Sequence, residues 1–143
     1  GGGNNGGDGY IIAALAKVDG LPVRVWALAD PALLQGDAAL AMQQALDAGV
    51  EIQSWQGEEP DLNSVIVDAM LGTGLSGVVR EKYMQAISTI NACGAPVLAI
   101  DLPSGLCSDT GSQLGVAVRA SATISFIGRK RGLYTLAPKQ HCI

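Results

Sequence analysis

Short apolar segments alternate in this sequence with segments of helical periodicity, and this alternation restricts the possible folds more than any other feature. The runs VIV (65–67) and VLAI (97–100) contain no polar residue. Strands of this kind are typical of parallel sheets that helices cover on both faces. Strands are predicted at residues 22–28, 50–55, 64–69, 96–100 and 122–127. Helices are predicted at residues 10–18, 37–48 and 81–93. The sequence therefore predicts an α/β, Rossmann-like three-layer fold with a mostly parallel sheet and helices on both faces.

The length and composition indicate a single domain over residues 1–143. Hydrophobic residues make up 48% of the chain and charged residues 15%, against a usual charged fraction of about 25%, which leaves ample apolar surface for a core. The net charge is −4. Because no basic stripe is present to neutralise phosphates, we expect no nucleic-acid partner.

The sequence also restricts the location of the protein and its chemistry. No apolar run approaches the roughly 18 residues of a membrane span, and no signal-peptide pattern is present. We therefore expect a cytoplasmic protein with no membrane partner. Three cysteines without a CxxC spacing predict free thiols, and His141 is the single histidine. Catalysis would then depend on carboxylates, hydroxyls and backbone groups.

Glycine is concentrated at the start of the chain. Residues 1–9 (GGGNNGGDG) contain a formal G-x-G-x-x-G at Gly1, Gly3 and Gly6, ahead of the first predicted helix. Two interpretations are equally open: a loop that binds a phosphate at the helix N-terminus, and a tight turn that binds nothing. Such a loop normally follows a strand, so we expect a strand before Gly1.

Two acidic residues end apolar strands in the second half of the chain. Asp68 is followed by AMLGTGLSG (69–77), and Asp101 is followed by LPSGL (102–106). Each could simply cap its own loop. However, strand ends at one edge of a parallel sheet are the usual ligand site in this architecture, and the recurrence favours carboxylates that bind a cation or a ligand hydroxyl. Asp101 also suits general acid–base catalysis.

One compact basic cluster follows the last predicted strand, at residues 129–132 (RKRG). A solvated turn is the more common use of such a cluster. The alternative is a clamp on a phosphate or carboxylate of the ligand.

Taken in order, these motifs resemble the NAD(P)H-hydrate epimerase family, the YjeF N-terminal domain. The resemblance rests on NNGGDG (4–9), DAMLGTG (68–74) and DLPSG (101–105), with DTG (109–111) after it. A further match places Lys130 and Gly132 where the family has a Lys and a Gly. Because the family has a helix and a strand before the first motif and a further strand after the last, we expect residues 1–143 to be a single domain that lacks its N-terminal helix and strand and some C-terminal residues.

The resemblance implies an isomerase of metabolite repair that interconverts the R and S epimers of the hydrated cofactors NADHX and NADPHX. It implies a Rossmann-like fold, a homodimer, and in some members fusion to a C-terminal ADP/ATP-dependent NAD(P)H-hydrate dehydratase domain. The residues assigned to substrate binding are Asn4, Asn5, Gly6, Gly7, Asp8, Gly72, Thr73, Gly74, Leu75, Ser76, Gly77, Val78, Asp101 and Lys130. A potassium ion would be held by Asn5, Asp68 and Ser104, and Asp101 would be the general acid–base. One carboxylate with neutral oxygens is a hard, weakly charged ligand set, which agrees with a monovalent ion.

Two other functions compete with this interpretation. A dehydrogenase dinucleotide-binding domain would need an acid about 20 residues after the glycines, which Asp30 fits loosely. It leaves Asp68 and Asp101 without a role. A non-catalytic, Rossmann-like nucleotide- or protein-binding module is the alternative from a different class, and the presence of Asn5, Asp68, Asp101 and Ser104 together counts against it.

Overall fold

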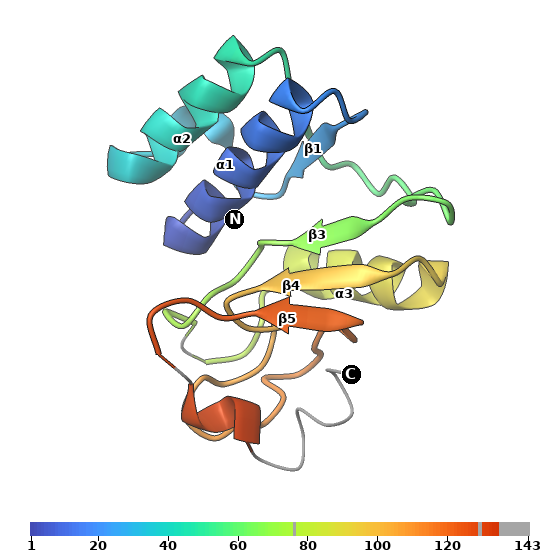
Figure 1. Cartoon of the computed structure of the whole chain (residues 1–143). Helices are drawn as coiled ribbons and strands as arrows, with labels where there is room; N and C mark the ends of the chain where they lie inside the picture. Colours follow the sequence, from blue (N-terminus) through green and yellow to red (C-terminus); the bar gives the residue numbers. More distant parts are fainter. Residues whose placement is uncertain (76, 129, 135–143) are drawn as a thin grey trace. The chain divides into compact units, whose positions relative to one another are not determined.

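The computed structural model describes residues 1–75, 77–128 and 130–134 (Figure 1). The chain forms two compact units, residues 1–56 and residues 57–143, and each is described here by itself. Within the described residues, no helix is long and apolar enough to cross a membrane. Cys93 and Cys107 are free thiols, whereas Cys142 and His141 lie outside the described residues.

The first unit combines two helices with two parallel strands. In chain order its elements are α1 (Asn4–Val18), β1 (Arg24–Ala27), the short 3-10 helix η1 (Pro31–Leu33), α2 (Gly36–Asp47) and β2 (Glu51–Ser54). Strands β1 and β2 pair in parallel. The helices α1 and α2 pack side by side (Figure 1), because small residues line their contact. The core of this unit contains Tyr10, Ala13, Ala14, Ala41, Ala45 and Val50.

Helix α1 corrects the predicted start of the first helix. The helix begins at Asn4, not at Tyr10, so most of the glycine segment is helical and does not form a loop. Packing explains why glycines are accepted there despite their low helix propensity. A Cβ on Gly6 would lie 2.1 Å from the Gly1 carbonyl oxygen, and a Cβ on Gly7 would lie 3.4 Å from the Cα of Ala38 on α2.

The second unit is a three-stranded parallel sheet with one long helix. Its elements are β3 (Ile66–Asp68), α3 (Glu81–Cys93), β4 (Val97–Ile100), β5 (Ala122–Ile124) and the 3-10 helix η2 (Arg131–Tyr134). The strand order is β3-β4-β5, and both pairs are parallel. Helix α3 lies behind this sheet in Figure 1. It has the predicted bounds 81–93, and Gly94 follows it as a left-handed cap with φ 75°.

The α/β class predicted from the sequence is confirmed, because every strand pair among the described residues is parallel, and helices connect β1 to β2 and β3 to β4. The predicted strand at 122–127 is wrong at its end. Strand β5 stops at Ile124, and the next two residues turn instead toward the end of β4, where they contact Asp101.

Candidate active site

The carboxyl ends of β3, β4 and β5 define the candidate site of the second unit. The three arrowheads point the same way in Figure 1, so the segments that follow the strands leave from one edge of the sheet. Asp68 is the last residue of β3, and Asp101 directly follows β4. The predicted arrangement of two acids at neighbouring strand ends is therefore confirmed.

Asp68 is a buried carboxylate that binds Ser104. One carboxylate oxygen, Oδ1, accepts a hydrogen bond from the Ser104 hydroxyl at 2.6 Å, and the other, Oδ2, accepts one from the Ser104 backbone N–H at 2.8 Å. Oδ1 also lies 3.3 Å from the backbone N of Met70. Asp68 is 1% exposed and Ser104 is 0% exposed. Burial raises the pKa of the Asp68 carboxyl, and the hydrogen bonds from Ser104 and Met70 oppose that rise.

These contacts confirm that Asp68 caps its own loop and show that it does more than that. The bond from Met70 is the loop cap that the simpler interpretation expected. The two bonds from Ser104 span 36 residues and connect the ends of β3 and β4, which a local cap does not do. Asp68 is thus a cap and also a buried group that links two strand ends.

The turn that presents Ser104 requires the glycine beside it. Gly105 has φ 96°, and a Cβ at this position would lie 2.0 Å from the Val116 carbonyl oxygen. The Ser104 carbonyl accepts a hydrogen bond from the Val118 N–H at 2.9 Å. The segment that crosses the turn therefore holds Ser104 against Asp68, and only glycine leaves room for it.

Asp101 occupies a different environment from Asp68. It has φ 71°, a left-handed conformation that is uncommon outside glycine and that Asp accepts better than most residues. Its backbone N–H donates to the Ile124 carbonyl at 2.6 Å. Its side-chain Oδ1 faces the Ser125 hydroxyl at 3.4 Å and the Phe126 N–H at 3.4 Å. The carboxylate is therefore placed among hydrogen-bond donors at the end of the sheet.

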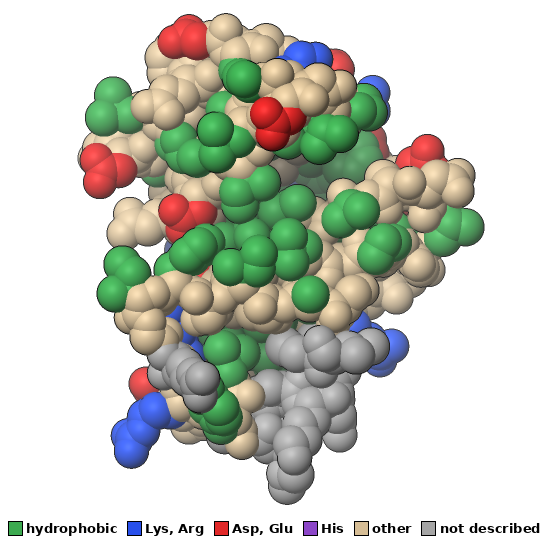
Figure 2. Space-filling model, in the orientation of Figure 1, with side chains coloured by type: hydrophobic (Ala, Val, Ile, Leu, Met, Phe, Trp, Pro, Cys, Tyr) green, Lys and Arg blue, Asp and Glu red, His purple; other side chains and the backbone are tan. Residues whose placement is uncertain are grey.

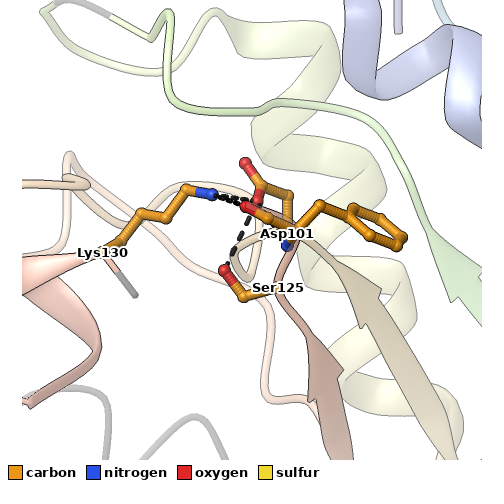
Figure 3. Close-up of polar contacts among 4 residues, drawn as sticks. Asp101, Ser125 and Lys130 are labelled. Carbon is orange, nitrogen blue, oxygen red and sulfur yellow. Dashed lines mark hydrogen bonds and ion pairs between the residues drawn. The ribbon is translucent and has the colours of Figure 1, made fainter. Parts of the chain in front are cut away.

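Lys130 completes the contacts of Asp101. Its Nζ donates to Asp101 Oδ1 in an ion pair of 2.5 Å, and to the Phe126 carbonyl oxygen at 2.8 Å. Figure 3 shows Lys130 and Ser125 converging on one oxygen of Asp101. The Lys130 side chain is only 18% exposed, so a solvated turn is the wrong description of this residue. The structure brings together two residues that the sequence assigned to the site separately.

The segment after β3 lies largely in solvent. Its exposed members are Thr73, Gly74, Gly77 and Val78, while Gly72 and Leu75 are partly exposed. The Leu75 N–H donates to the Gly72 carbonyl at 3.2 Å, which forms a turn. The Leu71 N–H donates to the Ser104 hydroxyl oxygen at 2.9 Å, so the segment begins beside the hydrogen-bonded pair of Asp68 and Ser104. Ser76, also assigned to substrate binding, lies outside the described residues.

The first motif belongs to the first unit, where it forms the start of α1. Asn5, Gly6 and Gly7 are buried, and Asn4 and Asp8 are exposed. A groove of about 450 Å³ runs between α1 and α2, and its lining includes Asn4, Gly7, Asp8, Asp37 and Gln44. Over these helices, Figure 2 shows acidic side chains among apolar ones.

Two residues that contact Asp101 were not predicted from the sequence, and Asp30, which loosely fitted the dehydrogenase interpretation, has a structural contact. Ser125 and the Phe126 backbone contact Asp101, and the only signal for them was their place directly after a strand at the same sheet edge. Asp30 instead caps η1, because its carboxylate accepts a hydrogen bond from the Ala32 N–H at 3.0 Å. That capping contact gives Asp30 a structural role independent of any dinucleotide.

The donor groups restrict which metal ion this unit could hold. Among the described residues, no group of three or more His, Cys, Asp and Glu side chains is placed to hold a metal. The Asp68 carboxylate and the Ser104 hydroxyl instead offer hard oxygen ligands with one negative charge. This set fits a hard cation of low charge.

Comparisons with known proteins show which family and which proteins this chain is similar to. The family model described as YjeF-related protein N-terminus matches residues 1–132. A Vibrio cholerae protein named bifunctional NAD(P)H-hydrate repair enzyme is 47% identical over 90% of this chain and 26% of its own length. A Levilactobacillus brevis protein named NAD(P)H-hydrate epimerase is 39% identical over 97% of this chain and 64% of its own length.

A solved structure shows the same fold. The crystal structure of yeast ynu0 superposes with a TM-score of 0.82 and 21% identity, over 98% of this chain and 60% of that chain. The chain spans about a quarter of the length of the bifunctional relatives it matches. Since the family model matches residues 1–132, nearly the whole chain, this chain belongs to the YjeF-related protein N-terminus family.

Proposed function

We propose that this chain is an NAD(P)H-hydrate epimerase domain that interconverts the R and S epimers of NADHX and NADPHX. Relatives that are 39–47% identical carry that activity or the corresponding repair function in their names. The single observation that carries the proposal is the position of Asp101. It is an ion-paired carboxylate, 16% exposed, at the carboxyl edge of a parallel sheet, which is where ligands of such sheets bind.

Asp101 would act as both acid and base in this reaction. The hydrated ring carries a hydroxyl on the carbon beside the ring nitrogen. The nitrogen lone pair expels that hydroxyl as the protonated form of Asp101 donates its proton to it, which leaves a flat cationic carbon, a water molecule and the Asp101 carboxylate. Water then adds to either face while the Asp101 carboxylate takes its proton, and the negative carboxylate stabilises the transient cation.

Asp68 and Ser104 would be the ligands that the second unit offers to a potassium ion. The buried Asp68 carboxylate, whose pKa burial raises, is stabilised in its charged form by a cation, and the Ser104 hydroxyl is a neutral oxygen ligand beside it. When bound, the ion would supply a fixed positive charge at the strand ends. The exposed segment at Gly72–Gly74 leaves the same sheet edge and would contact the substrate.

The wider assembly is part of the same proposal. The bifunctional relatives, of whose length this chain covers 26%, support a full-length protein with a further domain. A C-terminal dehydratase as that domain stays a prediction. The homodimer and the cytoplasmic location stay predictions.

The test is epimerisation of purified R-NADHX, followed by chromatography with potassium chloride or choline chloride. We expect potassium-stimulated conversion that the Asp101→Asn variant loses by about 100-fold or more. Asn accepts the left-handed φ of Asp101, so this variant should fold. Glu59→Gln, an exposed acid of the same unit, is the matched control and should keep full activity.

Either of two results would contradict the proposal. Conversion that Asp101→Asn retains in full would remove Asp101 from the chemistry. Absence of conversion by the folded protein, with no shift of its melting temperature by NADHX or by potassium, would favour the non-catalytic binding module.

A further inference from the structure

We propose that Lys130 is a positioning residue for Asp101: it fixes one carboxylate oxygen, so that the other oxygen exchanges the proton with substrate. This inference rests on the proposed function. It departs from the substrate-binding role that the family resemblance implies for Lys130. The two roles differ in which partner the ammonium contacts during the reaction.

All the donors that contact the Asp101 side chain in the described residues act on the same oxygen. Lys130 Nζ, the Ser125 hydroxyl and the Phe126 N–H each face Oδ1. In Figure 3 the other carboxylate oxygen of Asp101 points away from Lys130 and Ser125. A carboxylate held in this way presents one oxygen in a fixed direction, as proton transfer requires.

The ammonium of Lys130 is already engaged on the protein side. It donates to Asp101 Oδ1 and to the Phe126 carbonyl oxygen at 2.8 Å. The side chain is 18% exposed, so a substrate phosphate would have to compete with a partly buried ion pair. The contacts thus favour an ammonium that acts on Asp101 over one that acts on the substrate.

The backbone on both sides of the ion pair is held independently of it. The Asp101 N–H is fixed by the Ile124 carbonyl at 2.6 Å, and the Gly132 N–H donates to the Ser108 carbonyl at 2.7 Å. A Cβ on Gly132 would lie 2.4 Å from the Cys107 carbonyl oxygen, so the turn that carries Lys130 packs directly on the loop after Asp101. This close packing brings the ammonium to the carboxylate.

The charged groups around Asp101 come from each neighbouring strand end. Lys130 follows β5 and contacts Asp101 directly. Asp68 ends β3, next to β4 in the sheet, and its carboxylate is bound by Ser104 and Met70. Lys130 is therefore the cation that contacts the Asp101 carboxylate among the described residues.

The experiment compares kcat and KM for R-NADHX in Lys130→Met, Lys130→Arg and Ser125→Ala. Loss of the ammonium in Lys130→Met should lower kcat by up to about 100-fold with KM nearly unchanged, because a misplaced catalytic group slows chemistry without weakening binding. Lys130→Arg keeps the cation and should recover most of kcat. Ser125→Ala removes the weaker contact to the same oxygen and should lower kcat by a few-fold, again without a change in KM.

The matched control is Lys82→Met, which removes an exposed cation on α3 of the same unit and should leave both constants unchanged. A rise in KM with unchanged kcat in Lys130→Met would overturn the proposal and assign Lys130 to substrate binding. If Lys130→Met does not fold, kcat and KM of Lys130→Arg and Ser125→Ala test the proposal instead. A change in KM with unchanged kcat in these variants overturns it. An inactive wild-type protein would instead reject the proposed function itself.

Discussion

The hydroxyl of Ser104 lies 2.6 Å from the carboxylate of Asp68, although the two residues are 36 positions apart in the chain. Both side chains are buried, and the Ser104 N–H bonds the second carboxylate oxygen at 2.8 Å. This pair connects the ends of β3 and β4. It links the stability of the second unit to the group that would bind the cation.

Asp68→Asn should destabilise the protein. The Asn amide N cannot accept a hydrogen bond, and it would face either the Ser104 N–H or the Met70 N–H, so one backbone donor would lose its acceptor. The expected loss in the free energy of unfolding is about 1–3 kcal/mol, measured by urea denaturation in the absence of potassium. Glu59→Gln serves as the exposed control. An unchanged midpoint for Asp68→Asn would show that the pair contributes nothing to stability.

The pKa of Asp68 predicts a pH dependence of stability. Burial raises this pKa in the folded state above its ordinary value of 3.8, so the folded protein binds the proton more tightly than the unfolded chain. The contribution to stability is fully present below the unfolded pKa and is lost as pH rises through the folded pKa. Without potassium, the wild type should therefore lose stability relative to Asp68→Asn as pH rises from about 4. Parallel curves for the two proteins would contradict this.

Potassium should stabilise the wild type near neutral pH. A ligand that binds only the folded state adds about 2.7 kcal/mol at 100 times its Kd, which raises the melting temperature. Scans in potassium chloride and choline chloride at equal ionic strength separate ion binding from screening. Ser104→Ala removes one proposed ligand beside Asp68 and should reduce the difference between the two salts. An equal response of both proteins would argue against Ser104 as a ligand.

Gly105→Ala should be far more damaging than Gly74→Ala. At Gly105 the φ is 96° and a Cβ would lie 2.0 Å from the Val116 carbonyl oxygen, so the substitution adds a clash to a left-handed cost of about 1–2 kcal/mol. A Cβ at Gly74 would meet nothing within 4 Å. Thermal unfolding of the two variants measures the difference, and similar melting temperatures would refute the close approach of Val116.

Much of the fold could be predicted from local patterns. The helix at 81–93 has the bounds that the periodicity and Gly94 indicated. The strand ends at Asp68 and near Asp101 were also located, because apolar runs that stop at an acid are visible without any tertiary contact. The start of α1 at Asn4 could not be predicted in this way, because packing against Ala38 offsets the low helix propensity of glycine there.

Sequence by itself determined the alternation of parallel strands with helices, the strand-end positions of Asp68 and Asp101, and, through its ordered motifs, the family. Only the tertiary structure decided that Asp68 binds Ser104, that β5 ends at Ile124, and that Lys130 pairs with Asp101. The physical reason is the separation in sequence of the residues that interact. Periodicity depends on residues a few positions apart, whereas these bonds join residues 29 and 36 positions apart that meet only when the sheet brings its strand ends together.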